Sequence, residues 1–183
     1  PLRPYFEART NVIVTSGASE AISLALRAVT RPGDVVAIES PAFYGTLQAL
    51  EALGLRAVEV PCRPETGLDL DALDAILTRE RVAAVLAVPN FSNPTGSLMP
   101  DPAKRRLARL LADRGVPLVE DDICGDLAFG GGRPASVQSF ARKGLVLTCG
   151  AFSKTLAPGW RGGRPLPGRS RGQGLLSEFD LDG

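Results

Sequence analysis

Short apolar segments alternate with amphipathic segments over most of the chain, and this alternation restricts the fold more than any other feature. The apolar segments have the length of β-strands and cover residues 12–15, 35–39, 56–60, 82–88, 116–120 and 145–149. Helical spacing or helix-boundary residues mark the segments between them, at residues 19–29, 44–53, 69–77 and 101–115. Strands that alternate with helices form βαβ units. The sequence therefore predicts an α/β fold with a mainly parallel sheet and helices on both faces.

The last of these helices carries clear boundary signals. Asp101 is expected to cap its first turn, Pro102 suits that turn, and Gly115 is expected to end the helix. After Arg161 the pattern stops, because "GGRPLPGRSRGQGLLSEFDLDG" has six glycines and no hydrophobic period. We expect an irregular, flexible tail over residues 162–183. Because the sequence begins with proline rather than methionine, we also expect a piece of a longer chain or a processed one.

The composition excludes several classes of function. The 183 residues include no histidine, which removes Ser-His, Cys-His and histidine–metal mechanisms. The net charge of +1 gives no basic field for nucleic acid. Three cysteines without a CxxC pair indicate neither a zinc site nor a disulfide framework. No apolar run approaches the roughly 20 residues of a membrane-spanning helix, and no signal peptide is visible, so we predict a cytoplasmic protein without a membrane partner.

Parallel sheets bind ligands beyond the carboxyl ends of their strands, so the residues after each strand are the candidates. After the first expected strand, "TSGASEA" places Gly17, Ala18 and Ser19 at a helix start, whose free N–H groups suit a phosphate. An ordinary helix start with Ser19 as N-cap explains these residues equally well. After the second strand, Phe43 or Tyr44 of "SPAFYG" could stack on a planar ligand, with core packing as the alternative.

Three further strand ends carry polar residues. In "PNFSNPTG", Asn93 precedes a proline, whose peptide bond can be cis, and the fixed amide could hold a ligand oxygen; a plain turn is the alternative. "EDDIC" ends a buried strand with three acids, among them Asp121, which need a cation or donors unless the loop is solvated. In "GAFSKTLAPGWR", Lys154 lies in a mostly apolar loop and is a candidate amine nucleophile.

Together these features match the needs of pyridoxal 5′-phosphate. A lysine forms a Schiff base with this cofactor, and a carboxylate keeps its pyridine nitrogen protonated, which makes the ring an electron sink. The motifs "TSGASEA", "ESPAFYGTLQAL", "PNFSNPTG", "VEDDICGDL" and "FSKTLAPGWR" stand in the order seen in fold-type I, class I/II aminotransferases. The chain resembles this family over residues of about 12 to 161, which predicts a partial cofactor-binding large domain over residues 1–161.

The resemblance implies a role for each motif residue. Lys154 would bind the cofactor covalently and move the proton, and Asp121 would pair with the pyridine nitrogen. Asn93 would donate to the phenolic oxygen of the ring, and Phe43 would stack on the ring. The phosphate would be held by Gly17, Ala18, Ser19 and Arg161, and the cofactor-binding set also includes Ser153 and Cys124.

Two positions depart from the family pattern. Cys124 stands where the family often has a tyrosine that shares the phenolic oxygen, and a thiol is a weaker donor than a phenol. Ala151 stands where a phosphate-contacting serine is frequent. The segment with the substrate-binding arginine would follow Arg161, which leaves the substrate undetermined.

The resemblance is closest to MocR/GntR-type regulators and to kynurenine and 2-aminoadipate aminotransferases. The main hypothesis is amino-group transfer between an amino acid and a 2-oxo acid, with a homodimer expected for the full-length family. One alternative is the effector-sensing domain of a transcriptional regulator, which a winged helix before Pro1 would establish. The other is an inactive truncated remnant, which the cysteine, the alanine and the irregular tail favour.

Overall fold

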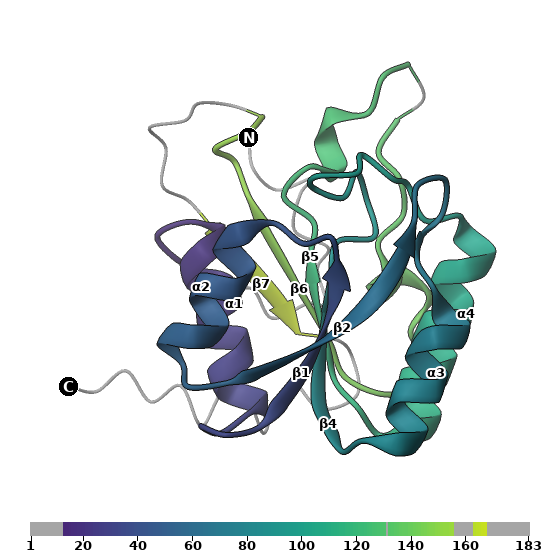
Figure 1. Cartoon of the computed structure of the whole chain (residues 1–183). Coiled ribbons are helices and arrows are strands. Elements are labelled where there is room, and N and C mark those ends of the chain that lie inside the picture. The colour runs from purple at the N-terminus through teal and green to yellow at the C-terminus, as the bar shows by residue number, and fades with distance from the viewer. Residues whose placement is uncertain (1–12, 131, 156–162, 168–183) are drawn as a thin grey trace.

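The strands of the chain form one sheet with its helices packed on both faces (Figure 1). The structure is a computed structural model that describes residues 13–130, 132–155 and 163–167. The strands are β1 Val35–Ser40, β2 Arg56–Arg63, β3 Gly67–Leu68, β4 Val82–Ala87, β5 Leu118–Asp121, β6 Val146–Ala151 and β7 Gly163–Pro167. The helices are α1 Ala18–Val29, α2 Tyr44–Ala52, α3 Leu70–Arg79 and α4 Asp101–Arg114, with 3-10 turns η2 Gly125–Leu127 and η3 Val137–Phe140.

The sheet has the order β3-β2-β1-β4-β5-β6-β7. Strands β2, β1, β4, β5 and β6 are parallel to one another, while β3 pairs antiparallel with β2 at one edge and β7 pairs antiparallel with β6 at the other. The predicted α/β architecture is therefore confirmed. Because the central strands are parallel, their carboxyl ends meet at one edge of the sheet, and the segments that follow them lie side by side there.

Alternate residues of each central strand pack against different helices. On β1, Val35 and Ala37 belong to the core that includes Leu107 of α4, together with residues of α3. Val36 and Ile38 belong to the opposite core, which includes Ala25 of α1 together with a leucine of α2. Burial on both faces explains why these strands read as continuous apolar runs in the sequence.

The ends of two helices differ from expectation. Pro100, not Asp101, is the N-cap of α4, and Asp101 begins the helix, where its charge suits the positive end of the helix dipole. Gly115 ends α4 as predicted, with a φ of 68° in the left-handed region that glycine adopts without strain. Gly17, not Ser19, is the N-cap of α1, so the reading of Ser19 as a capping residue is wrong.

Both ends of the expected pattern also differ. No strand is found over the described part, residues 13–15, of the strand expected over 12–15, although Thr15 makes an isolated bridge. The irregular tail expected over 162–183 contains a strand, because β7 pairs with β6 from Ala151↔Gly163 to Leu147↔Pro167. An edge strand tolerates proline, which has no N–H to donate, so the prolines of this segment are compatible with a strand at the edge of the sheet. Residues 168–183 lie outside the described segments.

Candidate active site

The predicted site residues follow adjacent strands at the carboxyl edge of the sheet. Phe43 follows β1, Asn93 follows β4, Cys124 follows β5 and Lys154 follows β6, and these four strands are neighbours in that order. The strand-end rule therefore brings together side chains that are up to 111 residues apart in the chain.

The amino end of α1 reaches the same edge. The short turn at residues 30–34 reverses the chain between α1 and β1, so α1 runs opposite to the strands and begins near their carboxyl ends. Figure 1 shows α1 packed beside β5, β6 and β7. The first hydrogen bond of the helix runs from the Ala21 N–H to the Gly17 carbonyl at 3.1 Å, which leaves the N–H groups of Ala18 and Ser19 without a helical acceptor. These N–H groups suit an anion.

The three consecutive acids at the end of β5 point to different faces. Glu120 accepts hydrogen bonds from the N–H groups of Val137 and Gln138 in η3. Asp122 accepts a hydrogen bond from the Asn90 amide. Asp121 points to the other face, toward α1, as the alternation of a strand requires. The solvated-loop reading of this run is wrong for Glu120 and Asp122, which are 0% and 3% exposed.

The carboxyl of Asp121 has a raised pKa and accepts a hydrogen bond from a backbone N–H. Burial raises the pKa of its carboxyl to about 6; the charge of Asp122 acts in the same direction, whereas the Ile123 N–H opposes it. Within the described segments its hydrogen bond comes from that backbone N–H, at 3.2 Å. A cationic N–H donor placed against this carboxylate would be stabilised by its charge.

Cys124 lies close enough to Asp121 and Lys154 for both charges to act on its thiol. Burial raises the pKa of the Cys124 thiol, the charge of Asp121 raises it further, and the charge of Lys154 lowers it. The structure thus brings together the three predicted residues from the ends of β5 and β6. Lys154 itself is exposed, in a turn closed by the Thr155 N–H to the Phe152 carbonyl at 3.2 Å, with Ser153 half-buried beside it.

Phe43 and Asn93 present open side chains at the same edge. Phe43 is 40% exposed, and its ring is tilted over that of Tyr44 with centroids 4.5 Å apart, so core packing does not account for it. Asn93 is exposed, and its bond to Pro94 is cis. Arg161, the predicted phosphate ligand, lies outside the described residues.

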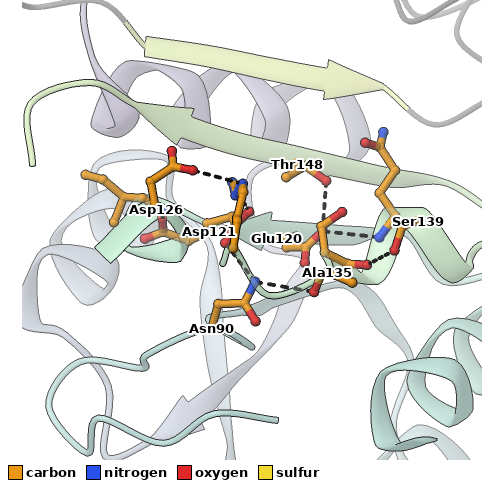
Figure 2. A network of polar contacts seen from close by, with 12 residues as sticks. Asn90, Glu120, Asp121, Asp126, Ala135, Ser139 and Thr148 are labelled. Atoms are coloured by element: carbon orange, nitrogen blue, oxygen red, sulfur yellow. Dashed lines mark hydrogen bonds and ion pairs between the residues drawn. The ribbon is translucent and has the colours of Figure 1, made fainter. Parts of the chain in front are cut away.

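A buried polar network beneath this edge was not predicted from the sequence (Figure 2). Lys104 of α4 is 1% exposed, and its ammonium donates to Asn90 Oδ1 at 2.6 Å and to the Ala135 carbonyl at 2.8 Å. The Asn90 amide donates to Asp122 Oδ1 at 2.9 Å, and the other Asp122 oxygen pairs with Arg133. The network joins the end of β4, the end of β5 and α4.

A second part of the network joins Glu120 to β6, where the Thr148 hydroxyl donates to Glu120 Oε2 at 2.8 Å (Figure 2). One sequence signal could have revealed the network. Lys104 shares the buried stripe of α4 with Leu107, Ala108 and Leu111, and a lysine in an apolar helical stripe requires buried partners.

Comparison with known proteins identifies the family. The family model described as aminotransferase class I and II matches residues 3–164. The chain belongs to this family. It is 43% identical over 159 residues to the uncharacterized HTH-type transcriptional regulator YjiR of Escherichia coli K12, covering 87% of this chain and 34% of that protein. It is 40% identical over 153 residues to the 2-aminoadipate transaminase of Thermus thermophilus, covering 82% of this chain and 38% of that protein.

Solved structures of aminotransferases share the fold. LysN, the α-aminoadipate aminotransferase of Thermus thermophilus, was crystallised with N-(5′-phosphopyridoxyl)-L-leucine; it aligns with a TM-score of 0.82 and 37% identity over 91% of this chain and 43% of its own. The kynurenine aminotransferase of Pyrococcus horikoshii aligns with a TM-score of 0.85 and 28% identity over 98% of this chain and 46% of its own. The chain spans about a third of the length of the matched YjiR and 2-aminoadipate transaminase.

Two absences hold for the described segments. None of their helices is long and apolar enough to cross a membrane. No group of three or more histidine, cysteine, aspartate or glutamate side chains is placed there to hold a metal ion.

Proposed function

We propose that this chain is the pyridoxal-phosphate-binding part of an aminotransferase, which transfers an amino group between an amino acid and a 2-oxo acid. The observation that carries the proposal is the position of Asp121. Its carboxyl lies on the α1 face at the end of β5, where its charge and that of Lys154 both act on the pKa of Cys124, and the amino end of α1 is on the same side of the sheet. Membership of the aminotransferase family supports the same reading.

The residues present fit the cofactor chemically. A pyridine nitrogen that keeps its proton would satisfy Asp121, and a phosphate would accept from the free N–H groups at Ala18 and Ser19. The exposed amine of Lys154 can reach a carbonyl carbon at the edge, while the exposed Asn93 amide can donate to a ring oxygen. When bound, the cofactor supplies an electron sink for the bonds of the amino acid; the chain holds the ring, supplies the amine and moves a proton through Lys154.

The test uses the small number of lysines. The sequence has three, Lys104, Lys143 and Lys154, of which Lys104 is buried in the network and the other two are exposed. The purified chain is incubated with pyridoxal phosphate and reduced with borohydride, and the modified peptide is mapped by mass spectrometry. The proposal predicts an adduct on Lys154 that is lost in Lys154→Ala, with Lys143 as an internal control.

Equal labelling of Lys143 and Lys154 would refute the proposal, because it would show that only exposure selects the lysine. That result would favour the inactive-remnant hypothesis. The enzyme hypothesis further predicts that an amino acid transfers its amino group to the bound cofactor in the full-length protein. It also predicts that the full-length protein is a homodimer and is located in the cytoplasm.

The second candidate function is the effector-sensing domain of a transcriptional regulator. It is favoured by the 43% and 42% identity to two regulators of Escherichia coli, YjiR and YdcR. The Lys154 adduct is expected under both hypotheses. Specific DNA binding by the full-length protein that changes with an amino acid, without turnover of a 2-oxo acid, would favour the regulator.

A further inference from the structure

The loop that carries Asn93 is anchored by a carboxylate from the neighbouring strand. Glu39 of β1 is 3% exposed; its Oε1 accepts the Val88 N–H at 2.9 Å and its Oε2 accepts the Ser92 hydroxyl at 2.6 Å. Ser92 is itself 2% exposed. One buried carboxylate therefore fixes both the first residue after β4 and the residue that precedes Asn93.

The turn of this loop closes by its own hydrogen bonds. The Ser92 N–H donates to the Ser97 carbonyl at 3.0 Å, and the Gly96 N–H donates to the Ser92 carbonyl. The Met99 N–H donates to the Pro89 carbonyl at 2.8 Å. These bonds form the turn without Glu39. The two hydrogen bonds to Glu39 fix the turn to β1, the strand that precedes Phe43 in the chain.

The backbone beside this anchor is strained. Phe91 has a φ of 56°, a left-handed conformation that is unfavourable for a residue with a side chain. Such a residue persists when its surroundings determine its conformation. Phe91 lies between two buried residues, Asn90 on the Lys104 network and Ser92 on Glu39. The conformation next to Asn93 is thus set from both sides.

We propose that Glu39 is a positioning residue that holds Ser92 so that the Asn93 amide faces the ring of bound pyridoxal phosphate. The inference rests on the proposed function. It goes beyond the roles implied by the family motifs, because Glu39 acts through Ser92 and the loop. A fixed amide loses less conformational entropy on binding, which raises the affinity for the ligand that it contacts.

Two substitutions of similar size separate hydrogen bonding from packing. Glu39→Gln keeps an acceptor for the Val88 N–H, and its amide can donate to the Ser92 oxygen after the hydroxyl rotates. Glu39→Met fills a similar volume and supplies neither bond. Ser92→Ala removes one of the two bonds and is the milder variant if Glu39→Met does not fold. Glu51→Met, at an exposed position of α2, is the control for a lost glutamate.

The first measurement is made without cofactor. Hydrogen exchange should accelerate at the amides of Val88, Ser92 and Gly96 in Glu39→Met, and remain near that of the wild type in Glu39→Gln. The second measurement is the affinity for the cofactor. We expect a loss of about tenfold or more in Glu39→Met, which corresponds to about 1.4 kcal/mol, and a loss under about threefold in Glu39→Gln.

The third measurement tests whether Glu39 acts through Asn93. Donation from Asn93 to the ring oxygen should set the pH midpoint of the visible absorbance of the bound cofactor. Glu39→Met should shift this midpoint in the same direction as Asn93→Ala. The double variant should shift it no further than Asn93→Ala alone, since the amide that Glu39 positions is gone.

The outcomes are distinguishable. If the wild type binds cofactor at Lys154 but Glu39→Met binds as tightly with the same midpoint, the inference about Glu39 is overturned and the proposed function stands. Additive shifts in the double variant would also overturn it, because they would show a general structural effect. If the wild type forms no adduct at Lys154, the proposed function fails, and the inference with it.

Discussion

Lys104→Met tests whether the buried network stabilises the fold. Methionine matches the length of the lysine stem, so the substitution removes the ammonium and leaves most of the packing between α4 and the sheet. The ammonium is the donor to Asn90 Oδ1 at 2.6 Å and to the Ala135 carbonyl at 2.8 Å, in a site where the lysine is 1% exposed. Burial raises the pKa of the Asp122 carboxyl, and the charge of Lys104 is one of the effects that oppose this rise.

The expected magnitude follows from these contacts. A buried acceptor that loses its donor costs about 1–3 kcal/mol, and the Lys104 ammonium is the donor to two acceptors. Loss of its charge also removes one of the effects that favour the charged form of Asp122. Relief of the desolvation of Lys104, which lowers the pKa of its ammonium, opposes both effects. Because Arg133 still pairs with Asp122, we expect a net loss of about 2–4 kcal/mol in the free energy of unfolding.

Urea unfolding of the purified chain at pH 7 measures this loss as a lower midpoint with an unchanged m-value. Lys143→Met is the matched control, because Lys143 is exposed, and surface changes are usually within about 0.5 kcal/mol. The double variant Lys104→Met with Asn90→Leu should lose less than the sum of the two single variants, since the hydrogen bond between these two side chains is then removed from both sides. A loss below about 0.5 kcal/mol in Lys104→Met, or strict additivity in the double variant, would refute the reasoning.

Three further substitutions test the electrostatics and packing of the same region. Burial raises the pKa of Glu120 from 4.5 to about 7, so the folded state holds this proton at higher pH than the unfolded state. The stability that this group contributes is therefore lost as the pH rises from about 4.5 through about 7. The fall in thermal midpoint over that range should be smaller in Glu120→Gln. Gly125→Ala should cost about 1–3 kcal/mol in urea unfolding, because its Cβ would lie 2.4 Å from Asp122 Oδ1; a neutral result would show that Asp122 can move. Cys124→Tyr should shift the pH midpoint of bound-cofactor absorbance, and an unchanged midpoint would place residue 124 away from the ring oxygen.

The central strands could be predicted from the sequence because burial on both faces makes them continuously apolar. β4 illustrates this, since Val82–Ala87 was expected over 82–88. The edge strands could not be predicted: β3 has two residues, and β7 contains prolines in a glycine-rich segment. Their formation depends on backbone pairing with β2 and β6, which leaves no periodic pattern in the sequence.

The gathering of the candidate residues Phe43, Asn93, Cys124 and Lys154 at one edge of the sheet could be predicted, because parallel strands place their carboxyl ends together and each of these residues follows a strand. The supporting network could not, since its bonds join residues far apart in sequence. Asn90 and Asp122 are 32 positions apart, and Lys104 and Ala135 are 31 apart. The sequence shows that such polar residues need partners, whereas the choice of partner depends on the packing of α4 and η3 against the sheet.

The acids Glu120, Asp121 and Asp122 show how one short motif serves two purposes. Because side chains alternate along a strand, Glu120 and Asp122 face the side of α4 and η3, where donors hold them, while Asp121 faces α1. The two outer acids fix the end of β5 to β6, to the Asn90 loop and to η3. The charge of Asp122 also contributes to the raised pKa of Asp121, of which burial is the main cause. A cationic partner on the α1 face would therefore relieve the cost of burying Asp121, so the framework that positions this carboxylate also favours a ligand that brings a positive N–H to it.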